Sequence, residues 1–360
     1  MGTATVANSI RSATSDTPDP FAEIRIVTLS AARGANYWSA RPITRMDLVV
    51  GAYDDISSAD SHGFVDRLTG ALPGLEEHRC SIGSRGGFIT RLNRGTYAPH
   101  IIEHVALELQ DLIGHHVGYG RTRGGDVDGQ YTVVMEHQHQ ATGLRAAALA
   151  LDVVQQAFAG VLERVDHVLA ELQSIAATPD VPPITPRVSC GITGGSGRAE
   201  LRNLIGERIG AADSIVVDVS PGFLLQAGLP YCKSRIAIVT DTELSDVPER
   251  YRERERAERL VSVIADGVDR GGLLIAPAKA WELQDHARRE NCSVAVFSGA
   301  DDITRKDKKV AVSAAWVADG DIVMEHRGRQ VAREPLTGEL PMHLQAAAAV
   351  ALYVLNTTRP

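Results

Sequence analysis

The chain has 360 residues, of which 44% are hydrophobic and 23% charged, and its formal net charge is -8. This composition is typical of a globular protein of about two domains, and the absence of a basic tract argues against nucleic acid as a partner. No run of about 18 apolar residues occurs, so we expect no membrane-spanning segment and no membrane partner. The four cysteines form no CxxC pair, which is typical of reduced thiols and favours a cytoplasmic location.

A proline-rich segment divides the sequence. Residues 178–186 read TPDVPPITP, which neither a helix nor a central strand tolerates. We therefore predict a flexible tail at residues 1–20, a first domain at 21–175, a linker at 176–187 and a second domain at 188–360. Few contacts are expected to cross such a linker.

The first domain has an α+β pattern with a small sheet. Alternating or β-rich runs predict strands, and apolar residues at helical spacing predict helices. Pro99 and Gly114 stand where a helix is expected to begin and to end. The expected strands are residues 23–29, 45–50 and 131–136, and the expected helices are residues 63–72, 99–113 and 144–175, the last as one long helix or a broken pair.

The second domain alternates short apolar runs with helical segments. The runs are SCGIT, SIVVDV, RIAIVT, GGLLIAP and SVAVFS. Such alternation predicts an α/β fold with a parallel sheet.

Histidines gather in the first domain, and two of them form a metal-binding pattern. His286, His326 and His343 are the only histidines outside it. His100, Glu103 and His104 form H-x-x-E-H within an expected helix. Histidines at i and i+4 share one helix face and can bind one zinc ion, while the glutamate is placed to act as general base. The alternative is a solvated helix face.

Three arginines lie in glycine-rich turns of the same domain. Arg85 stands in SRGG, and Arg121 and Arg123 stand in GRTRGG. They could hold substrate carboxylates by bidentate hydrogen bonds, or they could be ordinary surface arginines in loops. Asn36, Tyr37 and Trp38 could likewise line a peptide groove or pack in the core.

The first domain resembles the N-terminal domain of cyanophycin synthetases. The segments that carry the resemblance are RGANYWSARP at residues 33–42, LPGLEEHRCSIGSRGGFITRLNRGTYAPHIIEHVALELQ at residues 72–110 and VGYGRTR at residues 117–123. In some members of that family this domain is a metallopeptidase-like hydrolase, so the resemblance implies a zinc site here. No ATP-grasp segment, which follows this domain in the family, is expected between the two domains.

The third metal ligand remains open. Glu136 matches an acidic position of the family and is the favoured ligand. Glu108 is the alternative; it could bind the metal itself or could support the histidine ligands from behind. His137 and His139 are further nitrogen candidates. Cys80 is expected to be an inert thiol.

The second domain resembles a shortened central domain of Mur ligases. GITGGSGRAELRNLIGERIG, from Gly191, stands where that family has its phosphate loop. The loop should end in Gly-Lys-Thr, but Arg198 and Ala199 replace the lysine and the threonine. By this resemblance, Asp218 stands where the family has a metal-binding glutamate, and Asp241 stands where it has an asparagine. We therefore predict no nucleotide-binding residues.

Three hypotheses follow. The first is a zinc-dependent hydrolase of a peptide or amide bond in a cyanophycin-like peptide or a small amino-acid conjugate, acting as a homo-oligomer. The second is a relic of an ATP-dependent ligase that works with a partner. The third is a non-catalytic peptide-binding scaffold.

Overall fold

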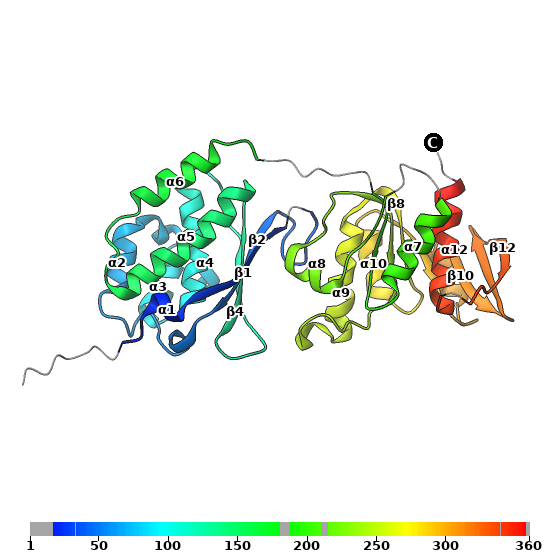
Figure 1. Ribbon diagram of the computed structural model, residues 1–360, viewed down its shortest axis with the longest axis horizontal. Helices are drawn as coiled ribbons and strands as arrows, with labels where there is room; N and C mark the ends of the chain where they lie inside the picture. Colours follow the sequence, from blue (N-terminus) through cyan, green and yellow to red (C-terminus); the bar gives the residue numbers. More distant parts are fainter. Residues whose placement is uncertain (1–16, 33, 181–187, 210–214, 339, 358–360) are drawn as a thin grey trace, which may run out of the picture.

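Two domains, each built around its own β-sheet, make up the protein (Figure 1). The computed structural model describes residues 17–32, 34–180, 188–209, 215–338 and 340–357. Most of the predicted tail and of the proline-rich linker lies outside the described residues. Within the described parts, no helix combines the length and the apolar character that a membrane crossing requires.

The first domain has an antiparallel four-stranded sheet covered on one face by helices, as an α+β fold predicts. Its strand order is β1-β2-β4-β3. The central helix α4 packs against β4, β3 and the long helix α5. Gly160, at φ 77°, ends α5, so the predicted helix at residues 144–175 is a broken pair. The elements are α1 (Pro20–Glu23), β1 (Arg25–Ala32), β2 (Ile43–Val49), α2 (Phe64–Ala71), α3 (Gly87–Arg94), α4 (Ala98–Asp111), β3 (Gly120–Gly124), β4 (Gln130–Glu136), α5 (Gln140–Ala159) and α6 (Asp166–Ala176).

The second domain has an eight-stranded sheet of order β12-β11-β10-β9-β8-β7-β5-β6. Strands β5 to β10 are parallel, which confirms the predicted α/β fold with a parallel sheet. Strands β11 and β12, which follow β10 through short turns, extend this sheet antiparallel at one edge. The strands are β5 (Val188–Thr193), β6 (Ile215–Asp218), β7 (Ser234–Val239), β8 (Val268–Pro277), β9 (Ser293–Phe297), β10 (Ser313–Ala318), β11 (Asp321–His326) and β12 (Arg329–Pro335).

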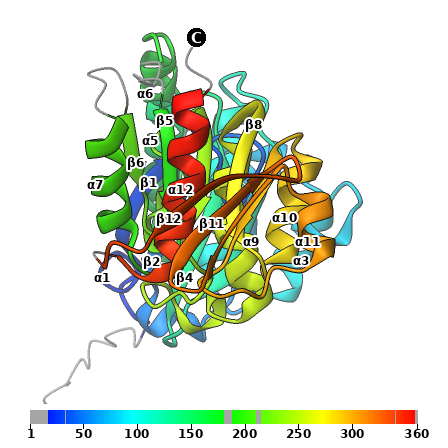
Figure 2. The ribbon, with the colours of Figure 1, turned by 90° about the vertical axis from the view of Figure 1, so that its right-hand side faces the viewer.

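Helices cover both faces of this sheet (Figure 2). One apolar core forms under α7 and α12, and a separate one under α8 and α9 with α10. Burial on both faces explains why the parallel strands read as short, nearly continuous apolar runs in the sequence. The helices are α7 (Arg198–Ile209), α8 (Pro221–Ala227), α9 (Arg254–Asp266), α10 (Trp281–Arg289), α11 (Arg305–Val310) and α12 (Met342–Thr357).

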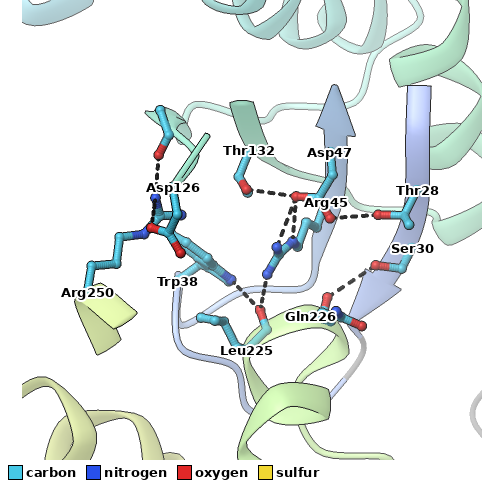
Figure 3. Close-up of polar contacts among 11 residues, drawn as sticks. Thr28, Ser30, Trp38, Arg45, Asp47, Asp126, Thr132, Leu225, Gln226 and Arg250 are labelled. Carbon is cyan, nitrogen blue, oxygen red and sulfur yellow. Dashed lines mark hydrogen bonds and ion pairs between the residues drawn. The ribbon is translucent and has the colours of Figure 1, made fainter. Parts of the chain in front are cut away.

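The two domains share a packed interface, contrary to the expectation that few contacts cross the linker. The indole of Trp38 and the guanidinium of Arg45 both donate to the main-chain carbonyl of Leu225, at 3.0 and 2.8 Å (Figure 3). Asp47 holds the Arg45 side chain in place at 2.9 Å. Trp38 is buried in one apolar cluster with residues of α8 and α9. It is therefore a core residue of the interface, and with Asn36 and Tyr37 it also lines a cavity of about 520 Å³, so the structure does not decide between the two alternatives.

Candidate functional site

The H-x-x-E-H residues lie on α4, which is buried along nearly its whole length. Pro99 occupies the first turn of this helix, where its missing N–H has no intrahelical partner to lose. Glu103 and His104 are 7% and 6% exposed. Ionisable side chains are rarely buried to this degree without partners. The pattern is therefore not a solvated helix face.

The structure brings a cysteine to the two histidines. One ligand atom each of Cys80, His100 and His104 lies within 4.8 Å of the others. The Cys80 sulfur is 3.3 Å from Nε2 of His100. Cys80 has φ 52°, a left-handed conformation that costs energy for a non-glycine residue and that concentrates at functional sites. Sulfur and imidazole nitrogen are the donors that zinc prefers.

A hydrogen-bonded chain behind His104 fixes its ring. Nδ1 of His78 is 2.8 Å from Nδ1 of His104, and Nε2 of His78 is 3.0 Å from the Glu108 carboxylate. If Nε2 of His78 donates to Glu108, Nδ1 of His104 donates to His78, and Nε2 of His104 keeps its lone pair. Thr96 contacts Nδ1 of His100 in the same way, at 2.8 Å. Partners of this kind orient metal-binding histidines. Glu108 thus lies behind the ligands.

Burial sets the protonation of the helix residues. It lowers the pKa of His100 to about 4, helped by the positive charge of Arg91. Burial, together with His100 and His78, lowers the pKa of His104 to about 2. Both imidazoles are therefore neutral near pH 7, which is the form that binds a metal. Burial raises the pKa of Glu103 to about 7, although a hydrogen bond from Thr122 opposes the rise.

Glu103 is held between α4 and β3. The Thr122 hydroxyl donates to Oε2 of Glu103 at 2.6 Å. Gly120 lies against the same side chain, and a Cβ at this position would come within 2.6 Å of Cγ and 2.7 Å of Oε1 of Glu103. The glycine therefore allows β3 to approach the glutamate closely.

We expect Gly120→Ala to lower hydrolytic turnover by about 10- to 100-fold, because a displaced catalytic group loses its alignment with the substrate. Zinc content should not change, since Gly120 lies against Glu103 and not against the metal-ligand cluster. Gly124→Ala on the same strand is the matched control, as a Cβ there meets nothing within 4 Å. Equal turnover of the two variants would show that the position of Glu103 does not matter.

A cavity of about 810 Å³ opens over this cluster. Cys80, His100, Glu103 and His104 all line it. The other lining residues come from the turn before α3, from α3 and the turn after it, from α4 and the loop after it, and from β3 and β4. They include His78, Arg79, Ser81, Arg91, Thr96, Tyr97, Pro99, Leu107, Val117, Arg121, Thr122 and Tyr131. The volume is large enough for a short peptide.

One of the three predicted substrate-binding arginines borders this cavity. Arg121 lines it, but it pairs with Val134 on β4, so its side chain lies on the face of the sheet opposite Thr122. Arg91, which sequence reasoning missed, also lines the cavity. Neither has an ion-pair partner among the described residues. Arg85 instead pairs with Glu77 on the exposed surface, and Arg123 does not line the cavity. The structure therefore does not bring Arg85 and Arg123 to the cavity: Arg85 lies in the turn before α3, and Arg123 lies on β3, on the face opposite Thr122.

The structure contradicts Glu136 as the third metal ligand. Its carboxylate accepts a hydrogen bond from Ser39 at 2.9 Å and lies 3.6 Å from Arg41. Side chains alternate along β4, so Glu136 shares its face with Val134, which belongs to the interdomain core, while Met135 belongs to the core of the first domain. Helix α4 packs on the Met135 face, so Glu136 points away from it.

The other nitrogen candidates also have different partners. Nδ1 of His137 lies 3.1 Å from the Thr44 hydroxyl. His139 caps the N-terminus of α5 and contacts the carbonyl of Thr178. Neither residue lines the cavity.

In the second domain, the chain's own side chains occupy the loop that the sequence resemblance matches to a phosphate loop. Asp241 accepts hydrogen bonds from the amides of Gly195 and Ser196 at 2.8 and 3.0 Å, and from the Ser196 hydroxyl at 2.7 Å. These amides would otherwise face a phosphate. Arg198 turns back onto the loop carbonyls of Gly194 and Gly195. Asp218, at the expected metal position, pairs with Arg202 at 2.7 Å.

We therefore expect the chain to show no magnesium-dependent ATP hydrolysis and no thermal stabilisation by ATP, since a ligand that binds only the folded state must raise its stability. Phosphate release and thermal unfolding with and without ATP measure this. Phosphate release that Arg198→Ala abolishes would contradict the prediction.

Sequence and structure comparisons relate the first domain to known proteins. Residues 45–159 match the family model of the cyanophycin synthase-like N-terminal domain. The cyanophycin synthetase of Trichormus variabilis is 42% identical over 154 residues, which are 42% of this chain and 16% of that protein. The cyanophycin synthetase of Synechocystis sp. is 40% identical over 155 residues, or 42% of this chain and 17% of that protein. The chain thus spans less than a fifth of the length of these relatives.

Among solved structures, the chain is similar to a murein peptide ligase from Psychrobacter arcticus. The TM-score is 0.35 and the identity 12%, over 57% of this chain and 50% of that chain. The N-terminal match is far more specific, and it includes α4 together with Cys80, His100 and His104. The part of the chain that contains the candidate site therefore matches the model of the cyanophycin synthase-like N-terminal domain.

Proposed function

We propose that the protein is a zinc-dependent hydrolase of peptide or amide bonds. The single observation that carries this proposal is the cluster of Cys80, His100 and His104 beside Glu103 in the 810 Å³ cavity. Three protein ligands with an open position are typical of catalytic zinc, whereas structural zinc has four.

The residues present fit zinc. The donors are two neutral imidazoles and a thiol, and the chain from His104 through His78 to Glu108 supplies an orienting shell. Bound zinc would supply Lewis-acid activation of water and of a substrate carbonyl.

Glu103 is suited to proton transfer. With a pKa raised to about 7, its carboxyl group can accept a proton from the attacking water and return it to the leaving amine near neutral pH. Thr122 fixes one carboxylate oxygen at 2.6 Å, which leaves the other oxygen for this transfer.

Arg91 gives the cavity a preference for carboxylate-bearing substrates. It is a lining residue without an ion-pair partner among the described residues, and a guanidinium binds a carboxylate by two parallel hydrogen bonds. A cyanophycin-like peptide is the substrate that the relationship to cyanophycin synthetases favours. A small amino-acid conjugate has the same two features, a carboxylate and an amide bond, and is the alternative substrate.

Metal removal tests the proposal. The purified chain should cleave a cyanophycin-like peptide without ATP, lose this activity on treatment with a chelator, and regain it with zinc. Cleavage that persists at full rate after the chelator has removed all metal would refute a metal-dependent hydrolase.

The second candidate is a ligase role together with a partner protein. The 42% identity to cyanophycin synthetases, which are far longer than the matched region, supports it. The occupied phosphate loop weakens it for this chain alone. ATP-dependent peptide extension by the chain and a partner, without any hydrolysis, would favour this candidate.

A further inference from the structure

A second cavity, of about 410 Å³, opens at the carboxyl ends of β7, β8 and β9. Ligands of open α/β sheets bind outside the carboxyl ends of the strands, at the point where the strand order reverses. Here β5 lies between β6 and β7 in the sheet, so the loops after β5 and β7 flank such a point. Ser196 and Asp241 line the cavity from these two loops.

The site no longer suits a phosphate. The loop amides already bind Asp241, as described above, and the carboxylates of Glu243 and Glu258 also line the cavity. Two cations are in the lining, but each has a partner. Lys279 pairs with Asp302 at 2.8 Å. Arg254 donates to Glu258 and to the carbonyl of Lys279, at 2.9 and 3.0 Å.

One carboxylate oxygen of Glu258 lacks a hydrogen-bond donor. It lies on α9, is 2% exposed, and receives Arg254 on Oε1 only. Its Oε2 is buried and has no hydrogen-bond partner among the described residues. A buried carboxylate oxygen without a donor is destabilising. Glu258 lines this cavity and also lines a cavity of about 520 Å³ beside Trp38.

The remaining walls are apolar. Pro277, Ala278, Ala280 and Phe297 line the cavity, and the ring of His343 stacks near that of Phe297. An alkyl chain fits such walls, and a charged N–H donor at its end would supply the hydrogen bond that the buried Oε2 of Glu258 lacks.

We propose that this cavity binds a small alkylammonium or alkylguanidinium group, with Oε2 of Glu258 as its acceptor. This site lies in the second domain, apart from the metal cluster on α4, and does not depend on the hydrolase proposal. The altered phosphate loop has thereby become part of a binding site for a cation.

Calorimetric titration of the full chain tests the proposal with butylguanidinium and butylammonium, and with butylurea as the uncharged analogue. We expect saturable binding of at least one cation and none of butylurea at the same concentrations. Glu258→Gln should lower the affinity at least about tenfold, because the amide presents a donor where the cation needs an acceptor. Glu255→Gln, one turn earlier on α9 and outside this cavity, should leave the affinity unchanged.

Equal binding of butylurea, no saturable binding of either cation, or an unchanged affinity in folded Glu258→Gln would each overturn the proposal. If Glu258→Gln does not fold, the proposal is tested by comparing the affinities of the unaltered chain for the two cations and for butylurea. Displacement of the organic cation by low concentrations of Mg²⁺ would show a metal site instead, and displacement by ATP would show a nucleotide site.

Discussion

Glu103→Gln is expected to lower hydrolytic turnover by about 10³-fold or more while the zinc content stays unchanged, because general acid–base catalysis contributes about 10²- to 10⁴-fold. The amide has nearly the same shape as the carboxylate but cannot accept a proton from water. It can still accept the hydrogen bond that Thr122 donates at 2.6 Å, so the fold should be retained. Turnover numbers and zinc content of the two purified proteins measure the effect.

Thr122→Val provides the comparison for this variant. It removes the hydrogen bond to Glu103 without removing the carboxylate, so its loss of turnover should be much smaller. A Glu103→Gln variant that turns over substrate at the rate of the unaltered protein would show that another group acts as the base.

Substitution of any one of the three proposed ligands by Ala is expected to remove the metal and with it the activity. Two protein ligands rarely hold catalytic zinc. His100→Ala, His104→Ala and Cys80→Ala should each purify with far less zinc than the unaltered chain. His116→Ala is the matched control, because this histidine of the same domain is exposed and pairs only with Asp111.

His78→Ala separates an orienting residue from a ligand. It should weaken zinc binding by about 10- to 100-fold without abolishing it, as loss of an orienting partner does. If Cys80→Ala keeps its zinc while both histidine variants lose theirs, Cys80 is not a ligand.

The helical part of the candidate site could be predicted from the sequence, because a helix places residues four apart on one face. The spacing of His100 and His104 therefore sufficed. Cys80 could not be predicted in this way, since its position depends on a short 3-10 turn, Cys80–Ile82, that the fold brings against α4. Its left-handed backbone leaves no signal in the sequence.

The wrong choice of Glu136 was avoidable in part. Residues of a strand alternate between two faces, so Met135 and Glu136 could not both face α4. The order of the strands and the position of α4 were needed to decide between them. Strand β3 was missed for a different reason: GRTRG has glycine at both ends and no apolar residue, and it pairs only because β4 offers an edge.

The domain interface was also beyond sequence reasoning. Arg45 and Trp38 reach the carbonyl of Leu225, 180 or more residues away along the chain, and a proline-rich linker carries no information about such contacts. Burial by itself would raise the pKa of Asp47, but Arg45 and hydrogen bonds from Thr28 and Thr132 outweigh it and hold that pKa below its usual value. From the sequence alone, charged residues such as Arg45 and Asp47 would be predicted to lie on the exposed surface.

Elemental analysis of the purified chain tests the central claim most directly. The cluster of Cys80, His100 and His104 predicts about one zinc per chain, as a single site with three protein ligands requires. It also predicts that His104→Ala, prepared in the same way, contains almost none. Metal-free protein that takes up no zinc when it is supplied, or equal zinc in the unaltered chain and in His104→Ala, would contradict the account.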